Sequence, residues 1–255
     1  MSRSANNRFQ DFFEEDKYIL LKNYLYNYLL RKSAVEKSLH KEDIKLALEI
    51  GSGISPVMTR TNRIIYSDVS FGALQILKRA LENQRYVVAD GMKLPFKPGV
   101  FSHAICSEVL EHLQDDCKAL NELSRVMSPS GSLILTVPHR KLYYSNDDRF
   151  VNHFRRYEIF ELEEKLKAAG LMPMHIQKVL GPLEKVTMSL VVFCFSKLRK
   201  LNSKRVKAIP KYRAIQFFVP LFKWANRLFM GLVWLDARMM PRAFATVLLI
   251  KAQKK

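Results

Sequence analysis

The run LALEIGSGISP at residues 46–56 constrains the fold of this chain more than any other segment. Leu46–Ile50 is predicted to form a short buried strand, and Gly51 and Gly53 directly after it permit a tight turn. The run lacks the third glycine of the dinucleotide-binding fingerprint, and only a very short helix could follow it. Taken alone, it indicates a nucleotide-binding site only weakly, and a plain strand-to-helix turn is the alternative.

Beyond this run, short apolar segments alternate with amphipathic ones. We expect strands at 64–66, 86–89, 101–106, 132–137, 174–179 and 245–251, and helices at 8–31, 71–81, 117–126 and 160–169. This alternation predicts an α/β fold with a doubly wound, mostly parallel sheet of seven strands. The N-terminal helix would be a packing helix or a lid over a site. A helical insertion would precede the last strand.

Acidic residues stand where the second and third strands are expected to end. Asp68 lies 19 residues after Glu49, about where an acidic residue reaches ribose hydroxyls in nucleoside-binding α/β folds. Asp90 closes the third strand, where its carboxylate or the next backbone amides could contact an adenine amino group. The alternative is a helix cap, because Asp68 or Ser70 could cap the helix at 71–81. Together with the glycine turn, the two carboxylates predict a pocket that recognises hydroxyls and amines.

Five segments resemble, in order and spacing, the motifs of class I methyltransferases that use S-adenosylmethionine (SAM). The segments are LEIGSG (48–53), YSDVS (66–70), VADGMKLPF (88–96), AICSEVLEHL (104–113) and LSRVMSPSGSLILTVP (123–138). The resemblance covers about residues 44–181 and is strongest to the bacterial and archaeal group that acts on small molecules and lipids. It implies a Rossmann-like methyltransferase sheet with SAM as cofactor.

The same resemblance implies which residues contact SAM. They are Glu49, Gly51, Ser52, Gly53, Asp68, Val69, Asp90, Gly91, Met92, Ser107 and Glu108. The glycine turn would line the methionine end, Asp68 would hold the ribose, and Asp90 and Met92 would hold the adenine. Ser107 or Glu108 would form the wall beside the methyl group. The short helix after Gly53 departs from the family pattern and leaves open which loop amides reach the cofactor.

Methyl transfer from a sulfonium needs mainly positioning and exclusion of water, because the leaving group takes no proton. A general base is required only when the acceptor is a hydroxyl or a protonated nitrogen. Three histidines are candidates for this base, namely His112, His139 and His153. The alternative for each is a packed or capping histidine. We expect no metal site.

The segment NDDRFVNHFRRY at 146–157 concentrates charged and aromatic side chains between the fifth strand and the next helix. Similar runs occur at the acceptor side of many methyltransferases of this group. Since arginine can clamp a phosphate or carboxylate with two parallel bonds, Arg155, Arg156 and Tyr157 are predicted to bind an anionic substrate. The alternative is an internal network of ion pairs that pins a lid.

The net charge of +18 is unevenly distributed. Residues 182–255 carry 16 Lys and Arg against two acids, a net charge of +14, whereas the first 181 residues are nearly balanced. This asymmetry points to an anionic partner, either nucleic acid or a membrane surface. Large apolar residues such as Trp224 and Trp234 are interleaved with the basic ones, as is typical of an interfacial amphipathic element. A helical cap packed on the domain or on another subunit is the alternative.

The composition, 48% hydrophobic and 26% charged, is that of a folded soluble protein. The three cysteines show no CxxC spacing, the first residues lack an apolar stretch, and no segment reaches the roughly 18 apolar residues of a spanning helix. We therefore expect a cytoplasmic protein, peripheral on the inner face of a membrane.

These observations predict four parts: a helical cap at 1–43, a SAM-binding core at 44–181, a basic apolar insertion at 182–242, and a final strand and tail at 243–255. The predicted function is transfer of a methyl group from SAM to a lipid, quinone or lipid-linked sugar at a membrane surface. The partners would be a small-molecule or lipid acceptor and an anionic membrane. An RNA or DNA methyltransferase that binds phosphates through the basic part is the alternative, and a SAM-binding protein without catalysis is a third possibility.

Overall fold

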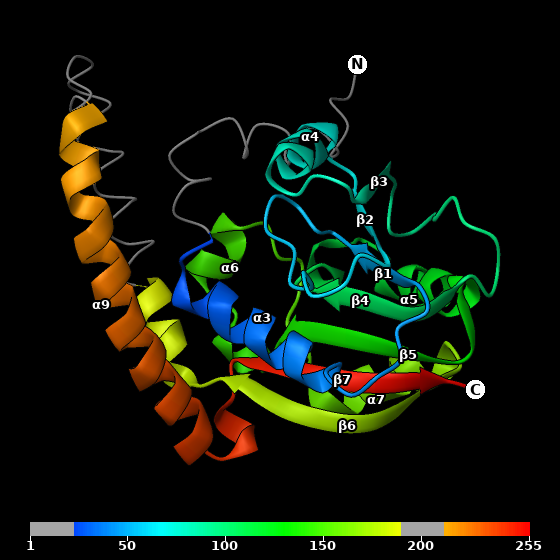
Figure 1. Ribbon diagram of the computed structural model, residues 1–255. Coiled ribbons are helices and arrows are strands. Elements are labelled where there is room, and N and C mark those ends of the chain that lie inside the picture. The colour runs from blue at the N-terminus through cyan, green and yellow to red at the C-terminus, as the bar shows by residue number, and fades with distance from the viewer. Residues whose placement is uncertain (1–22, 190–211) are drawn as a thin grey trace, which may run out of the picture.

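A computed structural model describes residues 23–189 and 212–255 of the chain. Seven strands form one sheet in the order β3-β2-β1-β4-β5-β7-β6. The strands are β1 (Ala47–Ile50), β2 (Ile64–Asp68), β3 (Arg85–Val88), β4 (Phe101–Ser107), β5 (Met127–Pro138), β6 (Leu171–Leu180) and β7 (Val247–Lys254). Strands β1 to β5 run parallel to one another, and β7 runs antiparallel to both β5 and β6. The predicted mostly parallel seven-stranded sheet is confirmed (Figure 1).

The helices that follow the strands also lie close to their predicted ranges. The α-helices are α3 (Tyr26–Ser38), α4 (Phe71–Ala80), α5 (Asp116–Val126), α6 (Asn146–Phe150), α7 (Ile159–Ala168) and α9 (Tyr212–Met239). Short 3₁₀ turns are η2 (Leu110–His112), η3 (Lys141–Tyr143) and η4 (Arg242–Phe244). A further helical segment at 182–189 leads toward α9. The helical insertion before the last strand is therefore present.

The largest boundary differences from the expectation are at the N-terminal helix and at β5. The predicted N-terminal helix ends at Arg31, but α3 continues to Ser38, because Val35 and Leu39 also pack into the core. Residues 8–22 of that predicted helix lie outside the described residues. Strand β5 begins at Met127, five residues before the predicted start, although Pro129 and Gly131 are typical turn residues.

Alternate residues along the strands supply two separate cores, one on each face of the sheet. Leu48 and Ala104 pack with side chains of α5 and α7 on one face. Ala47 and Ile105 pack with side chains of α3, α4 and α9 on the other. Figure 1 shows α3 crossing the near face beside the long helix α9. The carboxyl ends of β1, β2, β3 and β4 therefore meet at one edge, between these two layers.

Candidate functional site

The glycine turn after β1 brings this strand against the end of β4. Gly51 and Gly53 have φ angles of +64° and +51°, in the left-handed region that favours glycine. A Cβ atom on Gly51 would lie 2.2 Å from Cγ2 of Val109, which follows β4. The absence of a side chain at Gly51 therefore allows the two strand ends to approach closely.

Asp68, at the end of β2, is bonded to this turn. Its Oδ2 accepts a hydrogen bond from the backbone amide of Gly53 at 2.8 Å, and its Oδ1 accepts one from the amide of Ser70 at 2.8 Å. The cap of α4 is Ser70, whose hydroxyl accepts from the amide of Ala73 at 3.2 Å. The Asp68 carboxylate therefore lies between the glycine turn and the start of α4, where the ribose of a nucleoside is predicted.

The loop at Asp90 lies next to the same edge. Oδ1 of Asp90 accepts a hydrogen bond from the amide of Met92 at 2.9 Å, which holds the loop in a tight turn. A Cβ atom on Gly91 would lie 3.6 Å from side-chain atoms of Ile50 and Leu113, so the loop packs against the ends of β1 and η2. Beside the two carboxylates, Val69 is 39% exposed, which suits contact with a flat aromatic ring.

Glu49 is buried beneath the glycine turn. Its two carboxylate oxygens accept hydrogen bonds from the amides of Val57 and Met58 at 2.7 and 3.1 Å. Burial raises the pKa of Glu49 to about 8. The nearby hydroxyl of Ser52 is also buried and has no hydrogen-bond partner among the described residues. Glu49 thus holds the loop after β1 in place through its hydrogen bonds to Val57 and Met58. Direct contact of Glu49 with a cofactor stays a prediction.

Ser107 and Glu108 form the end of β4. The Ser107 hydroxyl lies 2.8 Å from that of Thr136, and the Thr136 hydroxyl donates to Glu108 Oε1 at 3.3 Å. Arg31 of α3 reaches the other oxygen of Glu108, with Nη1 3.4 Å from Oε2. Sequence reasoning missed Arg31 as a site residue, because its partner Glu108 lies 77 positions further along the chain. Helix α3 therefore reaches over this edge of the sheet.

His139 directly follows the end of β5. Its side chain is buried, Nδ1 lies 2.9 Å from the carbonyl oxygen of Ala245, and Nε2 lies 3.9 Å from Glu158. Burial lowers the pKa of His139, so the ring stays neutral near pH 7. A cavity of about 420 Å³ adjoins the His139 side chain. The residues that line this cavity are His139, Arg140, Glu158, Ile159, Phe160, Arg242 and Ala243. A role of His139 as a base stays a prediction.

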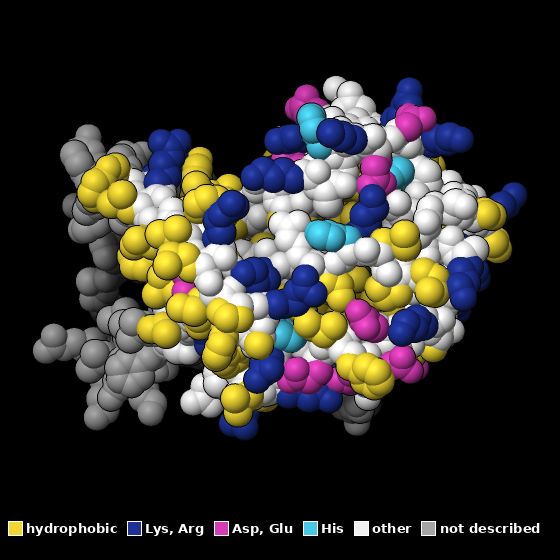
Figure 2. Space-filling view, turned by 90° about the horizontal axis from the view of Figure 1, so that it is seen from below, with side chains coloured by type: hydrophobic (Ala, Val, Ile, Leu, Met, Phe, Trp, Pro, Cys, Tyr) yellow, Lys and Arg dark blue, Asp and Glu magenta, His cyan; other side chains and the backbone are white. Residues whose placement is uncertain are grey.

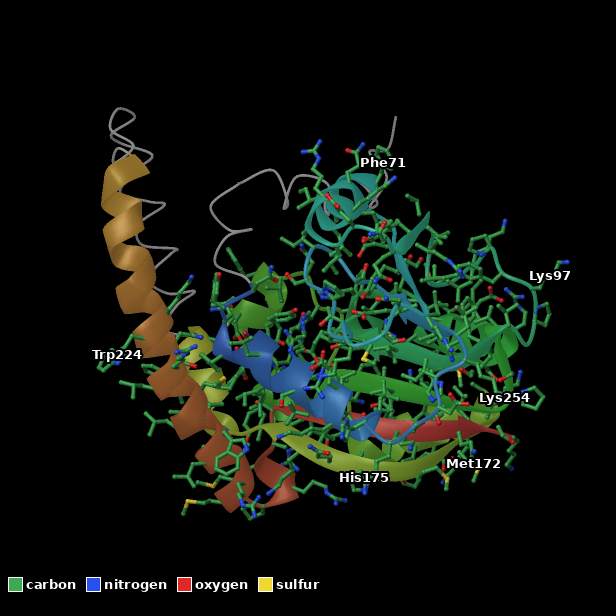
Figure 3. The ribbon with its side chains drawn as sticks, viewed as in Figure 1. Phe71, Lys97, Met172, His175, Trp224 and Lys254 are labelled. Carbon is green, nitrogen blue, oxygen red and sulfur yellow. The ribbon has the colours of Figure 1, made fainter. Side chains whose placement is uncertain are left out.

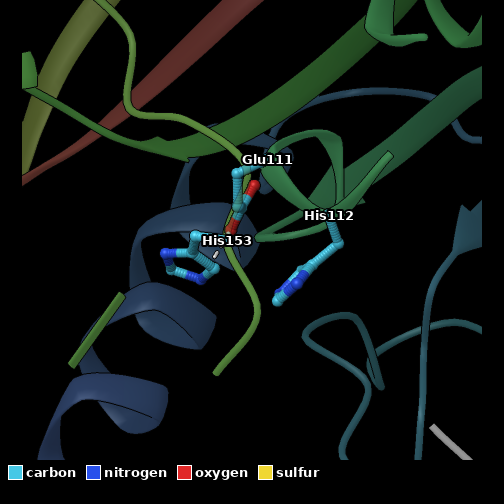
Figure 4. Close-up of side chains that lie close together, drawn as sticks. All are labelled: Glu111, His112 and His153. Carbon is cyan, nitrogen blue, oxygen red and sulfur yellow. Dashed lines mark ion pairs between the residues drawn. The ribbon is translucent and has the colours of Figure 1, made fainter. Parts of the chain in front are cut away.

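His112 and His153 lie together, although 40 residues separate them in the chain. Their ring centroids are 4.7 Å apart in an edge-to-face arrangement, next to Glu111 (Figure 4). Nδ1 of His112 lies 3.3 Å from the carbonyl oxygen of Asn152, and Nδ1 of His153 lies 2.9 Å from Oδ1 of Asp148. The structure thus joins η2 to the loop after α6.

The charged segment at 146–157 is held by internal contacts. The buried Asp148 accepts from Nε of Arg156 at 2.8 Å and pairs with Lys185 at 2.7 Å. Arg155 and the hydroxyl of Tyr157 both lie 2.9 Å from Oδ2 of Asp116. These contacts favour the alternative of an ion-pair network. Binding of a substrate by Arg155, Arg156 and Tyr157 stays a prediction.

Comparison with known proteins gives a consistent assignment. Residues 48–135 match the family model of a methyltransferase domain. An uncharacterized protein of Methanocaldococcus jannaschii is 35% identical over 108 residues, which are 42% of this chain and 46% of that protein. The demethylmenaquinone methyltransferase of Streptomyces griseus is 29% identical over 103 residues, which are 40% of this chain and 45% of the enzyme. The chain spans about half the length of these curated relatives.

The fold matches over nearly the whole chain. A chain in the complex between the Haloferax volcanii Trm112 methyltransferase activator and a methyltransferase has a TM-score of 0.61 at 14% identity, with 99% of both chains covered. An identity this low shows the fold alone. The strand order, with its antiparallel β7, is the arrangement of Rossmann-like methyltransferases. The glycine turn, Asp68 and Asp90 all lie within the matched residues. The chain therefore contains a class I, SAM-dependent methyltransferase domain.

Proposed function

We propose that this protein transfers a methyl group from SAM to a lipid, quinone or lipid-linked sugar acceptor at a membrane surface. When bound, SAM supplies an electrophilic methyl group that is open to in-line displacement. The polar groups at the strand ends suit this cofactor, since Asp68 offers acceptors for hydroxyls and the loop at Asp90 offers acceptors and backbone donors. The positive φ angles of Gly51 and Gly53 bring backbone close to the same edge.

The contribution of the chain to catalysis would be positioning and exclusion of water. Asp68 and Asp90 hold the nucleoside, and the contact between Arg31 and Glu108 keeps α3 over the end of β4. For a hydroxyl acceptor, a general base is required to take the proton, and a neutral histidine can serve as that base. His139 meets the requirement of protonation state, because burial lowers its pKa.

The observation that carries the membrane proposal is an apolar stripe on α9. Its members recur every three or four residues along one side of the helix and are 46–73% exposed. We call these residues the α9 stripe: Trp224, Leu228, Leu232, Leu235 and Met239. The opposite side of α9 packs on the domain through the buried residues Asn226, Val233 and Ala237. Figure 2 shows hydrophobic side chains gathered at this end of the molecule.

The position of α9 is determined by several contacts with the domain. The amide of Tyr26 donates to Oδ1 of Asn226 at 3.1 Å, and the rings of Tyr26 and Phe229 stack at 6.3 Å. At the other end, the amide of Leu183 donates to Oδ2 of Asp236 at 3.0 Å. The stripe is therefore presented outward by a helix that is attached to the domain at Asn226, Phe229 and Asp236.

Basic side chains flank the α9 stripe. Lys223, Arg227, Arg238 and Arg242 are partly or fully exposed. Each Lys or Arg near an anionic bilayer surface contributes about 1 kcal/mol, and each apolar side chain that enters the interface contributes roughly 1.5–3 kcal/mol. In the part of the chain that the structure describes, no helix has the length and hydropathy to span a membrane. The stripe and its charges fit a helix that lies in the plane of the interface.

Flotation with vesicles tests the membrane proposal. The full chain is mixed with vesicles of phosphatidylcholine with or without phosphatidylglycerol, and we expect binding that requires the anionic lipid. The triple variant Trp224→Ser, Leu228→Ser, Leu232→Ser is expected to bind at least tenfold more weakly, since about 1.4 kcal/mol corresponds to tenfold. Phe71→Ser is the matched control, because Phe71 is 58% exposed on α4, far from Trp224 (Figure 3).

The acceptor class is tested by methyl-tritiated SAM in a lysate, followed by phase extraction. Label in the organic phase supports a lipid acceptor. Label in nucleic acid, together with a steep salt dependence of RNA binding and no flotation, would favour the RNA or DNA alternative. A chain that binds an activator protein through the α9 stripe, and not lipid, would resemble the Haloferax volcanii complex in having such a partner. The triple variant would then lose binding of the activator as well.

A further inference from the structure

Glu111 is a buried carboxylate near the end of β4. It lies in η2, directly after that strand, and its residue is 0% exposed. Neither carboxylate oxygen has a hydrogen-bond partner among the described residues. A buried carboxylate is strongly disfavoured unless it is paired, protonated or bound to a metal.

His153 faces Glu111 in an orientation typical of a metal ligand. Its Nδ1 is bonded to Oδ1 of Asp148 at 2.9 Å, and its Nε2 lies 3.7 Å from Oε1 of Glu111, too far for a hydrogen bond. Asp148 is itself held by Arg156 and Lys185. A carboxylate bonded to one ring nitrogen orients the other nitrogen toward a metal.

His112 completes the group from the adjacent position in the chain. Its Nδ1 contacts the carbonyl oxygen of Asn152, and one ligand atom each of Glu111, His112 and His153 lies within 4.8 Å of the others (Figure 4). The loop that carries His153 is attached to η2, because the amide of Phe154 donates to the carbonyl oxygen of Glu111 at 2.9 Å. The backbone therefore holds the three side chains together before any ligand binds.

From this geometry we infer that Glu111, His112 and His153 bind one divalent transition-metal ion such as Zn²⁺. Two imidazoles and one carboxylate are a ligand set of catalytic zinc sites, which leave a fourth position open. Metal–ligand distances of about 2.0–2.2 Å place tetrahedral ligands about 3.3 Å apart, so small side-chain rotations suffice. The open position takes water or an oxygen of a small molecule. This assignment departs from the expectation of no metal site, and it holds whatever the methyl acceptor is.

The sequence contains little sign of this site. Glu111 and His112 are adjacent, but the third ligand follows only after 40 intervening residues, and no cysteine takes part. The adjacent pair by itself is compatible with a plain helical turn.

Metal titration of the full chain tests the inference. The protein is purified with a chelator, freed of it, and titrated with Zn²⁺ by calorimetry in the presence of a competing chelator. We expect one Zn²⁺ per chain, and at least tenfold weaker binding for Glu111→Gln, His112→Ala and His153→Gln. His175→Ala is the matched control, because His175 is an exposed histidine on β6 (Figure 3). Circular dichroism checks that each variant is folded.

A second probe keeps the test independent of folding at the buried positions. His112 is partly exposed, so His112→Ala is expected to fold normally. Co²⁺ should give visible ligand-field absorption with the unmodified chain and with His175→Ala, and none with His112→Ala. The inference is overturned if the unmodified chain shows no saturable binding of one ion, or if His112→Ala binds Zn²⁺ as tightly as His175→Ala. In that case Glu111 is simply a buried side chain without a ligand.

Discussion

Nη1 of Arg31 lies 3.4 Å from Oε2 of Glu108, which joins α3 to the carboxyl end of β4. Both side chains are less than one-fifth exposed. Glu108 has a φ angle of +54°, which is uncommon for a residue with a side chain. Contacts from Arg31 and Thr136 therefore hold a strained residue at the wall of the predicted cofactor site.

Arg31→Ala is expected to weaken SAM binding about fivefold, since a partly exposed ion pair contributes roughly 1 kcal/mol. Calorimetry with SAM measures the effect. Arg60→Ala is the control. Nε of Arg60 lies 2.8 Å from Oε2 of Glu36, and Glu36 belongs to α3 as Arg31 does. If Arg60→Ala weakens SAM binding equally, the effect comes from α3 stability and not from the contact with Glu108.

Gly51→Ala is expected to destabilise the fold by about 2–4 kcal/mol, through both the positive φ angle and the clash with Val109. Urea unfolding measures the free energy. Gly99→Ala separates the two effects, because Gly99 has a φ of +73° but an added Cβ atom would have no neighbour within 4 Å, so this change should cost only about 1 kcal/mol. Adding Val109→Ala to Gly51→Ala should recover part of the loss. No recovery would show that the close approach of the strand ends is unimportant.

Asp68→Ala is expected to weaken SAM binding at least 100-fold, because hydrogen bonds to a charged group contribute about 1.5–3 kcal/mol each. The same change releases the amides of Gly53 and Ser70 from their partner. Calorimetry with SAM measures the affinity, and Asp43→Ala, at an exposed position before β1, is the control. An unchanged affinity in Asp68→Ala would contradict the assignment of the ribose site.

Asp148→Asn is expected to lower the free energy of unfolding at pH 7 by roughly 3 kcal/mol, as when one partner of a buried pair is removed. Burial would raise the pKa of Asp148, but hydrogen bonds from His153 and Lys185 and the charge of Arg156 lower it overall from 3.8. The stabilisation by Asp148 is therefore fully present above pH 3.8 and is lost as the pH falls below that value.

Urea unfolding between about pH 3 and pH 7 measures this dependence. Below pH 3.8 the unmodified chain should lose stability more steeply than Asp148→Asn, so that the two curves converge in acid. Asp43→Asn should follow the unmodified chain throughout. Parallel curves for the unmodified chain and Asp148→Asn would contradict the ionised state of Asp148.

Local signals were sufficient to predict much of the fold. Strand β2 and helix α4 begin at their predicted residues. Their starts are predictable because the spacing of apolar residues and a capping residue such as Ser70 are both contained in a short stretch of chain. The start of β5 was missed, since Pro129 and Gly131 indicate a turn. Pairing with β4 and β7 keeps this segment extended.

Of the candidate site, the sequence by itself determined the strand ends, the glycine turn and the two carboxylates of Asp68 and Asp90. These follow from the order of motifs along the chain. Only the tertiary structure decided that Glu111 meets His153, that Arg31 meets Glu108, and which side of α9 stays exposed. Each of these depends on contacts between segments far apart in the chain. The burial and the pairing of a side chain depend on the neighbours that tertiary packing brings to it. The periodicity of a short segment does not reveal which residues those neighbours are.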